Sequence, residues 1–362
     1  MYENGRGVSQ NYTLAFDWNK KAAVQGDLRA QTALGLSYEY AQGTAQNLSE
    51  AVSWYKKAAA QDYMYAQYNL ARAYQFGQGV SRNYTLAFDL YTTAANKGHP
   101  ASQNGLGVLY EFGNGVQQNY AKAIEWYTKA ANQNLATAQT NLADMYYDGK
   151  GTPKNYAKAL ELYSKAANQD NIHAQNTMGI LYERGHGVSQ SYTKAHEWYM
   201  KAAQQNDKYA QYNLGTLYYD GLGVEQNYSR SFDWYSKSAN QGHSSAQFSL
   251  ALQYYNAQGT AKNYEKAHEW YSKAASQDHA AAQNNLATMY LDGLGTPQNT
   301  AIANNWFLKA ANNGNAMAQF NIGRSYYYGN NGLPQNRALA RTWLQKAANN
   351  GHAQAKLMLA GL

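Results

Sequence analysis

The residues with the richest chemistry in this chain are its eight histidines, since it contains no cysteine. Without thiols, disulfides, thiolate metal sites and thiol nucleophiles are excluded. Two copies of His-Glu-Trp, at 196–198 and 268–270, begin like the His-Glu-x-x-His motif of zinc proteases, but the fourth residue after each histidine is Met200 or Ser272. Neither position supplies the second histidine, so we expect no metal site and no cofactor.

Carboxylates could instead act as a general acid and base, which requires two of them close together in space. Asp148, Asp220 and Asp292 recur at a wide and equal spacing beside a glycine turn, which separates them rather than pairs them. Aspartate in such a place is typical of a turn. No serine, histidine and aspartate stand in an arrangement typical of a nucleophilic triad either. The sequence therefore predicts that the protein is not an enzyme.

Glycine turns could also cradle a phosphate, as in the segment YLDGLGTPQN at 290–299. A phosphate site is needed once, whereas the second glycine of this segment recurs ten times along the chain. Its positions are Gly7, Gly43, Gly79, Gly115, Gly151, Gly187, Gly223, Gly259, Gly295 and Gly332. Because glycine adopts positive φ at little cost, we predict that these glycines close tight connections between helices.

The glycines belong to an internal repeat, since the chain superposes on itself when shifted by 36 residues, until one residue is inserted near Asn331. The clearest marker is one tryptophan per unit: Trp18, Trp54, Trp126, Trp198, Trp234, Trp270 and Trp306, with leucines filling two gaps. A length of 362 residues would suggest two or three domains, but a repeat overrides that expectation. We therefore expect one continuous array over residues 1–362.

Each unit is predicted to contain two short helices. In the first helix, apolar residues from Ala66 to Tyr74 recur at i, i+4, i+5 and i+8. In the second helix, residues from Ala123 to Ala131 form a stripe with the spacing i, i+3, i+4, i+7, i+8, which includes Trp126 and Tyr127. The second helix is entered through asparagine or serine, which we predict to be its N-cap. These residues are Asn11, Asn47, Asn83, Asn119, Asn155, Ser191, Asn227, Asn263, Asn299 and Asn336.

These units resemble the Sel1-like repeat, a relative of the tetratricopeptide repeat. Segments such as AQTNLADMYYDGKGTPKNYAKALELYSKAA carry the small residue after leucine, the tyrosine four residues beyond that leucine, and the Gly-x-Gly turn. The resemblance covers essentially the whole chain, although asparagine or serine stands where the family often has aspartate at the start of the second helix. It implies an all-α, right-handed α-solenoid of about ten 36-residue repeats. It also implies a concave surface lined by the first helices and a role as an adaptor or scaffold.

The composition narrows the range of partners. Charged residues make up 15% of the chain and the net charge of +7 is spread without a basic block, so we expect no nucleic-acid partner. The chain has no apolar run long enough to span a membrane, and residues 1–20 do not resemble a signal peptide, so we expect no membrane insertion. A protein or peptide partner remains.

Two functional classes are open. The first is an adaptor that binds a peptide or protein along the concave groove. The second is a structural filament, because the sequence begins and ends in the middle of a unit and neither end has an evident polar cap. The chain is then either an excerpt of a longer array, or a molecule whose last unit stacks on the first unit of the next copy.

Comparison between units locates the candidate groove. The positions of Tyr68, Arg72 and Gln75 lie about 140–200° from the core leucine of the first helix, at 100° per residue, and should face the groove. Aromatic residues gather there in units six to nine, and the alternative is that they pack against neighbouring helices. The candidate groove residues are Tyr68, Arg72, Tyr147, Tyr212, Tyr219, Phe248, Tyr255, Phe320 and Tyr327. The repeated Gln67 position points closer to the core, and we predict inter-unit hydrogen bonds for it.

Four of the predicted N-caps also begin N-glycosylation sequons, at Asn11, Asn47, Asn83 and Asn227. Glycans at these sites, together with low charge and abundant Asn, Gln and Tyr, would suit a secreted or cell-surface protein. The alternative is a cytoplasmic or periplasmic protein in which these asparagines only cap helices.

Overall fold

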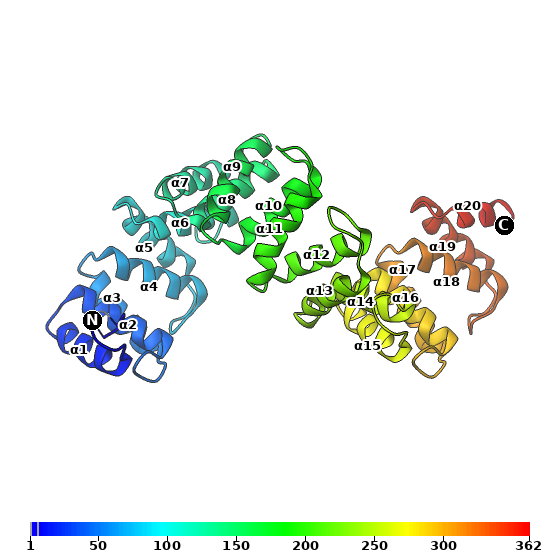
Figure 1. Cartoon of the computed structure of the whole chain (residues 1–362), viewed down its shortest axis with the longest axis horizontal. Helices are drawn as coiled ribbons and strands as arrows, with labels where there is room; N and C mark the ends of the chain where they lie inside the picture. Colours follow the sequence, from blue (N-terminus) through cyan, green and yellow to red (C-terminus); the bar gives the residue numbers. More distant parts are fainter. Residues whose placement is uncertain (1, 6) are drawn as a thin grey trace. The chain divides into compact units, whose positions relative to one another are not determined.

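The computed structural model describes residues 2–5 and 7–362 of the chain. This part of the chain forms twenty helices of 8 to 13 residues and contains no strand (Figure 1). The predicted all-α solenoid of two-helix repeats is confirmed. Met1, which the repeat predicts to lie in a first helix, is outside the described residues.

We call the first helix of each repeat its A helix and the second its B helix. The A helices are α2 (Leu28–Tyr40), α4 (Met64–Phe76), α6 (Pro100–Phe112), α8 (Ala136–Asp148), α10 (Ile172–Arg184), α12 (Lys208–Asp220), α14 (Ser244–Asn256), α16 (Ala280–Asp292), α18 (Ala316–Tyr328) and α20 (Ala353–Ala360). The B helices are α1 (Tyr12–Val24), α3 (Leu48–Ala59), α5 (Tyr84–Asn96), α7 (Tyr120–Asn132), α9 (Tyr156–Ala167), α11 (Tyr192–Gln204), α13 (Tyr228–Asn240), α15 (Tyr264–Ala275), α17 (Thr300–Asn312) and α19 (Arg337–Asn349).

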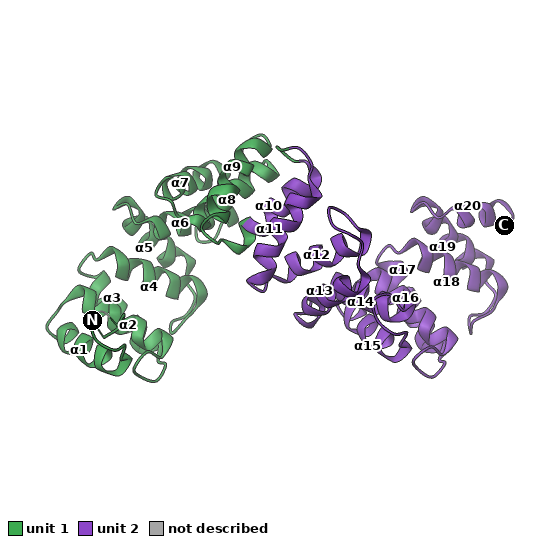
Figure 2. Ribbon diagram, in the orientation of Figure 1, with its two compact units in different colours: residues 1–174, 186–188 green, residues 175–185, 189–362 purple. Residues whose placement is uncertain are grey.

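The chain divides into two compact units (Figure 2). Unit 1 comprises residues 1–174 and 186–188, and unit 2 comprises residues 175–185 and 189–362. Helices α1 to α9 therefore lie in unit 1, helices α11 to α20 lie in unit 2, and the division passes through α10. Within each unit, every helix packs against the next one along the chain.

The ends of the helices follow from the local sequence. All ten predicted N-caps are confirmed, because each side-chain oxygen accepts the backbone N–H three residues further on, as Asn119 does from Lys122 at 3.0 Å. The A helices from α2 to α18 end at a left-handed residue, such as Gly77 with φ +70° or Gly113 with φ +71°. Glycine adopts this conformation without the steric penalty of a Cβ.

In eight of the ten turns, all but those of Gly7 and Gly332, the second glycine is required by a close approach as well as by its φ. Gly79 has φ +69°, and a Cβ built there would lie 2.2 Å from the carbonyl oxygen of Leu48, at the start of the preceding B helix. Gly295 stands in the same relation to Tyr264, also at 2.2 Å. The turn thus packs directly on the backbone of the preceding repeat. This confirms that the glycines connect helices, including those of the segment 290–299.

In seven of the ten B helices, α3 to α15, a buried tyrosine stands at the centre of the core. Tyr127 is completely buried, and a Cβ on Gly107 of the facing A helix would lie 2.6 Å from its ring, which explains the small residue at that position. Trp126, predicted to belong to the core, is only partly buried at its edge. The ammonium group of Lys129 lies 4.0 Å from the centre of the Trp126 ring and covers it from solvent.

The repeated glutamine joins consecutive repeats, as predicted. In unit 1, the Gln103 amide on α6 donates to the carbonyl oxygen of Ala95 on α5 at 3.2 Å. Within its own repeat, the Gln103 oxygen accepts from Gln133, at the end of α7, at 2.8 Å. The same link recurs between Gln139 and Gln169 at 2.8 Å. Because these amides are buried, each bond satisfies a polar group that would otherwise be left without water.

Candidate binding surface on the A helices

The side of each A helix that carries the positions of Tyr68, Arg72 and Gln75 forms a surface that we call the A face. All nine predicted groove residues lie on A helices. Eight of them are half-buried, and Phe320 is buried with 7% of its surface exposed. Ligand binding by these residues stays a prediction, but the structure shows what each of them contacts within the protein.

Aromatic residues at the Tyr68 position pack against a histidine that begins the next A helix. The ring centroids of Tyr68 and His99 lie 4.9 Å apart, and the equivalent distances are 4.8 Å for Tyr212 with His243, 4.7 Å for Phe248 with His279, and 4.3 Å for Phe320 with His352. Where this position is Asn or Thr, as at Asn104 and Thr140, the next A helix has no histidine there. Aromatic residue and histidine occur together, so part of each ring is used in packing between repeats.

These histidines act as helix caps. The ring Nδ1 of His99 accepts the backbone N–H of Ser102 at 3.2 Å, and His279 accepts that of Ala282 at the same distance. An accepting Nδ1 requires the neutral ring with its proton on Nε2. Burial accordingly lowers the pKa of His99, His243 and His279. Sequence reasoning missed this role, although the shared spacing of the histidines was the available signal.

Glutamates occupy the Gln75 position in three repeats and accept hydrogen bonds from the core tyrosines. The Tyr55 hydroxyl donates to Glu39 at 2.7 Å, Tyr127 donates to Glu111 at 2.8 Å, and the equivalent pair in unit 2 is Tyr199 with Glu183 at 2.6 Å. Burial and the adjacent carboxylate raise the pKa of Tyr55 and Tyr127. These hydroxyls therefore stay protonated and hold the carboxylates in place.

Two of these glutamates also hold a cation from the following repeat. A guanidinium nitrogen of Arg72 lies 3.4 Å from Glu39, and the Lys150 ammonium lies 3.5 Å from Glu111. The Arg72 guanidinium also donates to the Tyr40 hydroxyl at 3.4 Å. The A face of unit 1 is thus a mixture of paired charges and aromatic rings.

Tyrosines occupy the Gln75 position in other repeats and pack on the first residue of their own B helix. The ring centroids lie 5.2 Å apart for Tyr147 with Tyr156, for Tyr219 with Tyr228 and for Tyr255 with Tyr264. Tyr327 of α18 instead contacts the neighbouring Tyr328, with centroids 4.8 Å apart. Each of these residues remains half-buried and keeps part of its ring on the A face.

Two pockets open on the A face at equivalent places in the repeat. The first, of about 210 Å³, lies between α4 and α6 of unit 1 and is lined by Arg72, Gln75, Phe76 and Tyr91, among others. The second, of about 170 Å³, lies between α14 and α16 of unit 2. Its lining comprises Leu252, Tyr255, Asn256, Tyr271, Asn285 and Thr288.

Exposed aromatic residues mark the first three A helices of unit 1 at a position that sequence reasoning missed, whereas α8 ends in Asp148 there. Tyr40, Phe76 and Phe112 are the last residues of α2, α4 and α6, and 53%, 60% and 63% of their surfaces are exposed. We call these three residues the aromatic row. In unit 2, helices α12, α14 and α16 end in Asp220, Asn256 and Asp292 at this position. Helix α18 again ends in an aromatic residue, Tyr328. Comparison of the units at this one further position would have revealed the row.

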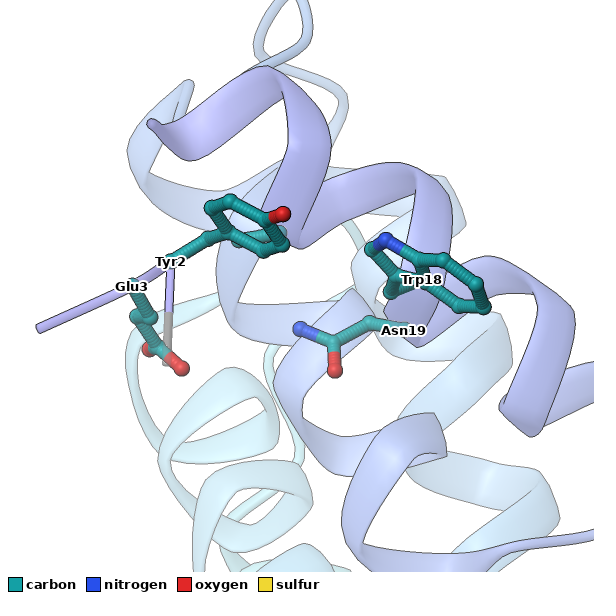
Figure 3. Close-up of a pocket in the computed structure, with 5 residues that line it drawn as sticks. Tyr2, Glu3, Trp18 and Asn19 are labelled. Carbon is teal, nitrogen blue, oxygen red and sulfur yellow. The ribbon is translucent and has the colours of Figure 1, made fainter. Parts of the chain in front are cut away.

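A further pocket, of about 280 Å³, lies beside α1. Tyr2 and Glu3 from the segment before α1 line it together with Trp18 and Asn19, and the Asn19 amide points toward Tyr2 and Glu3 (Figure 3). Asn19 occupies the position of Tyr55 in the next repeat, where the tyrosine ring fills the space. The pocket is thus explained by a shorter side chain at a core position.

The other predicted sites are consistent with exposed or structural positions. Asn11, Asn47, Asn83 and Asn227 are exposed N-caps, and their glycosylation stays a prediction. Within residues 2–5 and 7–362, no group of three acidic, histidine or cysteine residues is placed to hold a metal ion. No helix in this part of the chain is long and apolar enough to cross a membrane.

Comparison with known proteins identifies the repeat. The model of the Sel1 repeat matches the chain over residues 1–27, 28–63, 65–99, 100–135, 136–171, 172–207, 208–243, 244–279, 280–315 and 316–352. Each complete match covers one A helix and the B helix that follows it. A search of curated proteins found no match to the chain.

Two solved structures show the same architecture. The chain is 37% identical to c5321, a protective antigen present in uropathogenic Escherichia coli strains that displays an SLR fold, over 99% of this chain and 76% of that one, with a TM-score of 0.81. It is 30% identical to a Sel1 repeat protein from Oxalobacter formigenes, over 83% of this chain and 87% of that one, with a TM-score of 0.63. With ten Sel1 repeats along nearly its whole length, this chain belongs to the Sel1-repeat family.

Proposed function

We propose that this protein is a non-enzymatic scaffold that binds an extended segment of a partner protein along its A face. Sel1-repeat proteins are generally protein-interaction scaffolds and are typically not enzymes. The proposal adds the surface that does the binding: the aromatic row with the adjacent pocket in unit 1, and the equivalent pocket in unit 2.

The observation that carries the proposal is the exposure of the aromatic row beside a pocket. Phe76 is 60% exposed and also lines the pocket between α4 and α6. A large apolar ring left in water loses the free energy that its burial would provide, about 25 cal/mol for each Å². Exposed aromatic residues beside a pocket are the residue types and the setting in which binding energy concentrates.

The polar groups around both pockets suit a peptide backbone. Gln75 on α4 and Asn285 on α16 already bond to the tyrosine at the base of their pockets, at 2.7 and 3.1 Å. Their amides present further donors and acceptors, which the main chain of an extended segment can satisfy. Apolar side chains of that segment would enter the pockets, which are lined by Val108 in unit 1 and Leu252 in unit 2.

Crosslinking from the aromatic row tests the proposal. A photoreactive phenylalanine analogue replaces Phe76, the crosslinked partner is identified by mass spectrometry, and its affinity for purified wild-type and variant proteins is then measured. We expect F76S with F112S to weaken binding by about tenfold or more, because interface aromatic residues carry much of the binding energy.

The matched control is Val24→Ser, which removes an apolar side chain that is 71% exposed on α1 and lies outside the A face. It should leave the affinity unchanged. Surface substitutions of this kind shift stability by no more than about 0.5 kcal/mol, so a melting curve shows that the variants remain folded. Equal affinities for wild type, the control and the A-face variant would contradict the proposal.

The filament, the N-linked glycans and the secreted or cell-surface location stay predictions.

A further inference from the structure

We propose that Glu183, on the A face of unit 2, recognises an arginine side chain of the partner. The proposal rests on the function proposed above and adds the chemistry of one contact. It comes from comparing Glu183 with the two other glutamates that occupy the same position of the repeat.

Those two glutamates are each paired with a cation of their own chain. Glu39 pairs with Arg72, and Glu111 pairs with Lys150, in both cases from the following repeat. The residues that stand in the same relation to Glu183 are Thr216 and Leu222, neither of which carries a charge. In the described part of the chain, no ion pair joins the Glu183 carboxylate to a lysine, arginine or histidine.

The Glu183 carboxylate is nevertheless built into the structure in the same way. One of its oxygens, Oε2, accepts the hydroxyl of Tyr199 at 2.6 Å, as Glu111 does from Tyr127 at 2.8 Å. The side chain is half-buried, so water replaces a lost cation only in part. A carboxylate held in this way attracts a cation more strongly than a freely moving one on the surface does.

The neighbourhood of Glu183 favours arginine. Ile180 and Leu222 are half-buried and pack on the same core cluster of α11 and α12, which provides an apolar surface for the methylene groups of a long side chain. The planar guanidinium donates in a fork that matches the two oxygens of a carboxylate, and it sheds water more easily than an ammonium group. Arginine therefore fits both the apolar and the charged part of the site.

Titration with a minimal probe tests the site in the full chain. N-acetyl-arginine amide is added to protein with labelled isoleucine and leucine methyl groups, and N-acetyl-citrulline amide, which has the same shape without the charge, serves as the matched probe. We expect the arginine probe to shift the methyl signals of Ile180 and Leu222, and the citrulline probe to bind about tenfold more weakly or not at all.

Four variants sharpen the test. E183Q keeps the shape and an acceptor for Tyr199 and should weaken the arginine probe by about tenfold or more, whereas E111Q, whose carboxylate is already paired with Lys150, should not. L222K places an internal cation at the position that Lys150 occupies and should also abolish binding at Glu183. K150L removes the cation from Glu111 and should create a second arginine site there.

The proposal is overturned if the arginine probe leaves the Ile180 and Leu222 signals unchanged, or if E183Q and L222K both bind it as wild type does. Methyl signals far from α10 report whether each variant is folded, and L222K retains the Glu183 side chain should E183Q unfold. The result is separable from the proposed function, because partner binding through the aromatic row of unit 1 is measured independently of the probe.

Discussion

The two pockets of the A face occupy equivalent places in a repeat of unit 1 and a repeat of unit 2, yet most of the side chains that line them differ. Arg72 in the pocket of unit 1 corresponds to Leu252 in the pocket of unit 2, and Gln75 corresponds to Tyr255. The tyrosine beneath both pockets is the same, and it is buried in both units. The lining of the first pocket includes the charged Arg72, whereas the lining of the second carries no charged residue.

This difference shows how a repeat protein separates stability from recognition. Positions that pack between helices keep mostly one residue type, such as the buried tyrosine from Tyr55 to Tyr271, because a change there costs core contacts. Positions on the A face are partly exposed, so each repeat can carry a different side chain at little cost to the fold. Two places with the same backbone therefore present different chemistry to a partner.

The largest effects should come from the shared tyrosine. Replacing Tyr91 or Tyr271 with alanine removes a buried ring and leaves a cavity, so each variant should lose about 3–5 kcal/mol of unfolding free energy. Urea unfolding, with hydrogen exchange to assign the loss to its unit, measures this change. The control Phe112→Ala removes an exposed ring of the A face and should cost no more than about 0.5 kcal/mol. A loss below about 1 kcal/mol at either tyrosine would show that the two pockets do not share a scaffold.

A smaller loss of stability should distinguish a tyrosine hydroxyl that bonds to a carboxylate from one that bonds to a neutral amide. Tyr127→Phe strips a hydrogen bond from the Glu111 carboxylate and should cost about 1.5–3 kcal/mol. Tyr271→Phe removes a bond from the neutral amide of Asn285 at 3.1 Å and should cost about 0.5–1.5 kcal/mol. Thermal and urea unfolding of both variants give the two values. Equal losses would mean that the carboxylate adds nothing to the anchoring of the A face in unit 1.

The smallest effect should be the response of the two units to acid. Burial lowers the pKa of His99 in unit 1 and of His196, His243, His268 and His279 in unit 2 below the ordinary value of 6.5. The unfolded chain then binds more protons than the folded chain at pH values just below 6.5, so stability rises with pH there. The contribution of these histidines to the free energy of unfolding is complete above pH 6.5 and is lost as the pH falls. Unit 2 should lose more protection against hydrogen exchange than unit 1 between pH 7 and pH 5.

The matched control for this response is His279→Asn. Asparagine caps the equivalent helix at Asn315 and does not titrate, so the variant should keep the cap and lose its share of the pH dependence. The substitution should change the free energy of unfolding by less than the approximately 1 kcal/mol that an N-cap bond contributes. The same response in both units would show that these buried histidines are not its source.

Much of the fold could be predicted from the sequence, because the residues that determine it either act locally or recur once in every repeat. Asn119 caps its helix by accepting the backbone N–H three residues further on. Gly79 is required by its own positive φ and by its close approach to the first residue of the preceding B helix. The apolar spacing of each helix is likewise contained in a few residues. Contacts between repeats, such as that of Gln103 with the Ala95 carbonyl, become predictable because the same bond recurs at Gln139 and Gln247.

The candidate site was less predictable, because its properties depend on what neighbouring repeats leave uncovered. The sequence placed Tyr212 and Phe248 on the A face, but their packing against His243 and His279 depends on residues of the next repeat. The exposure of Phe76 and Phe112 could not be inferred from residue type, which by itself favours burial. Trp126 was expected in the core for the same reason and lies at its edge.

By itself, the sequence determined the repeat, its two helices, their caps and turns, and the positions that form the core, because these depend on spacing within one unit. Only the tertiary structure decided which A-face groups are already paired. Glu39, Glu111 and Glu183 occupy the same position of the repeat, and stacking gives the first two a cation from the next repeat, whereas the residues at the equivalent positions for Glu183 are the uncharged Thr216 and Leu222. The charge that a carboxylate offers to a partner depends on what lies within a few ångströms of it, and the fold sets those distances.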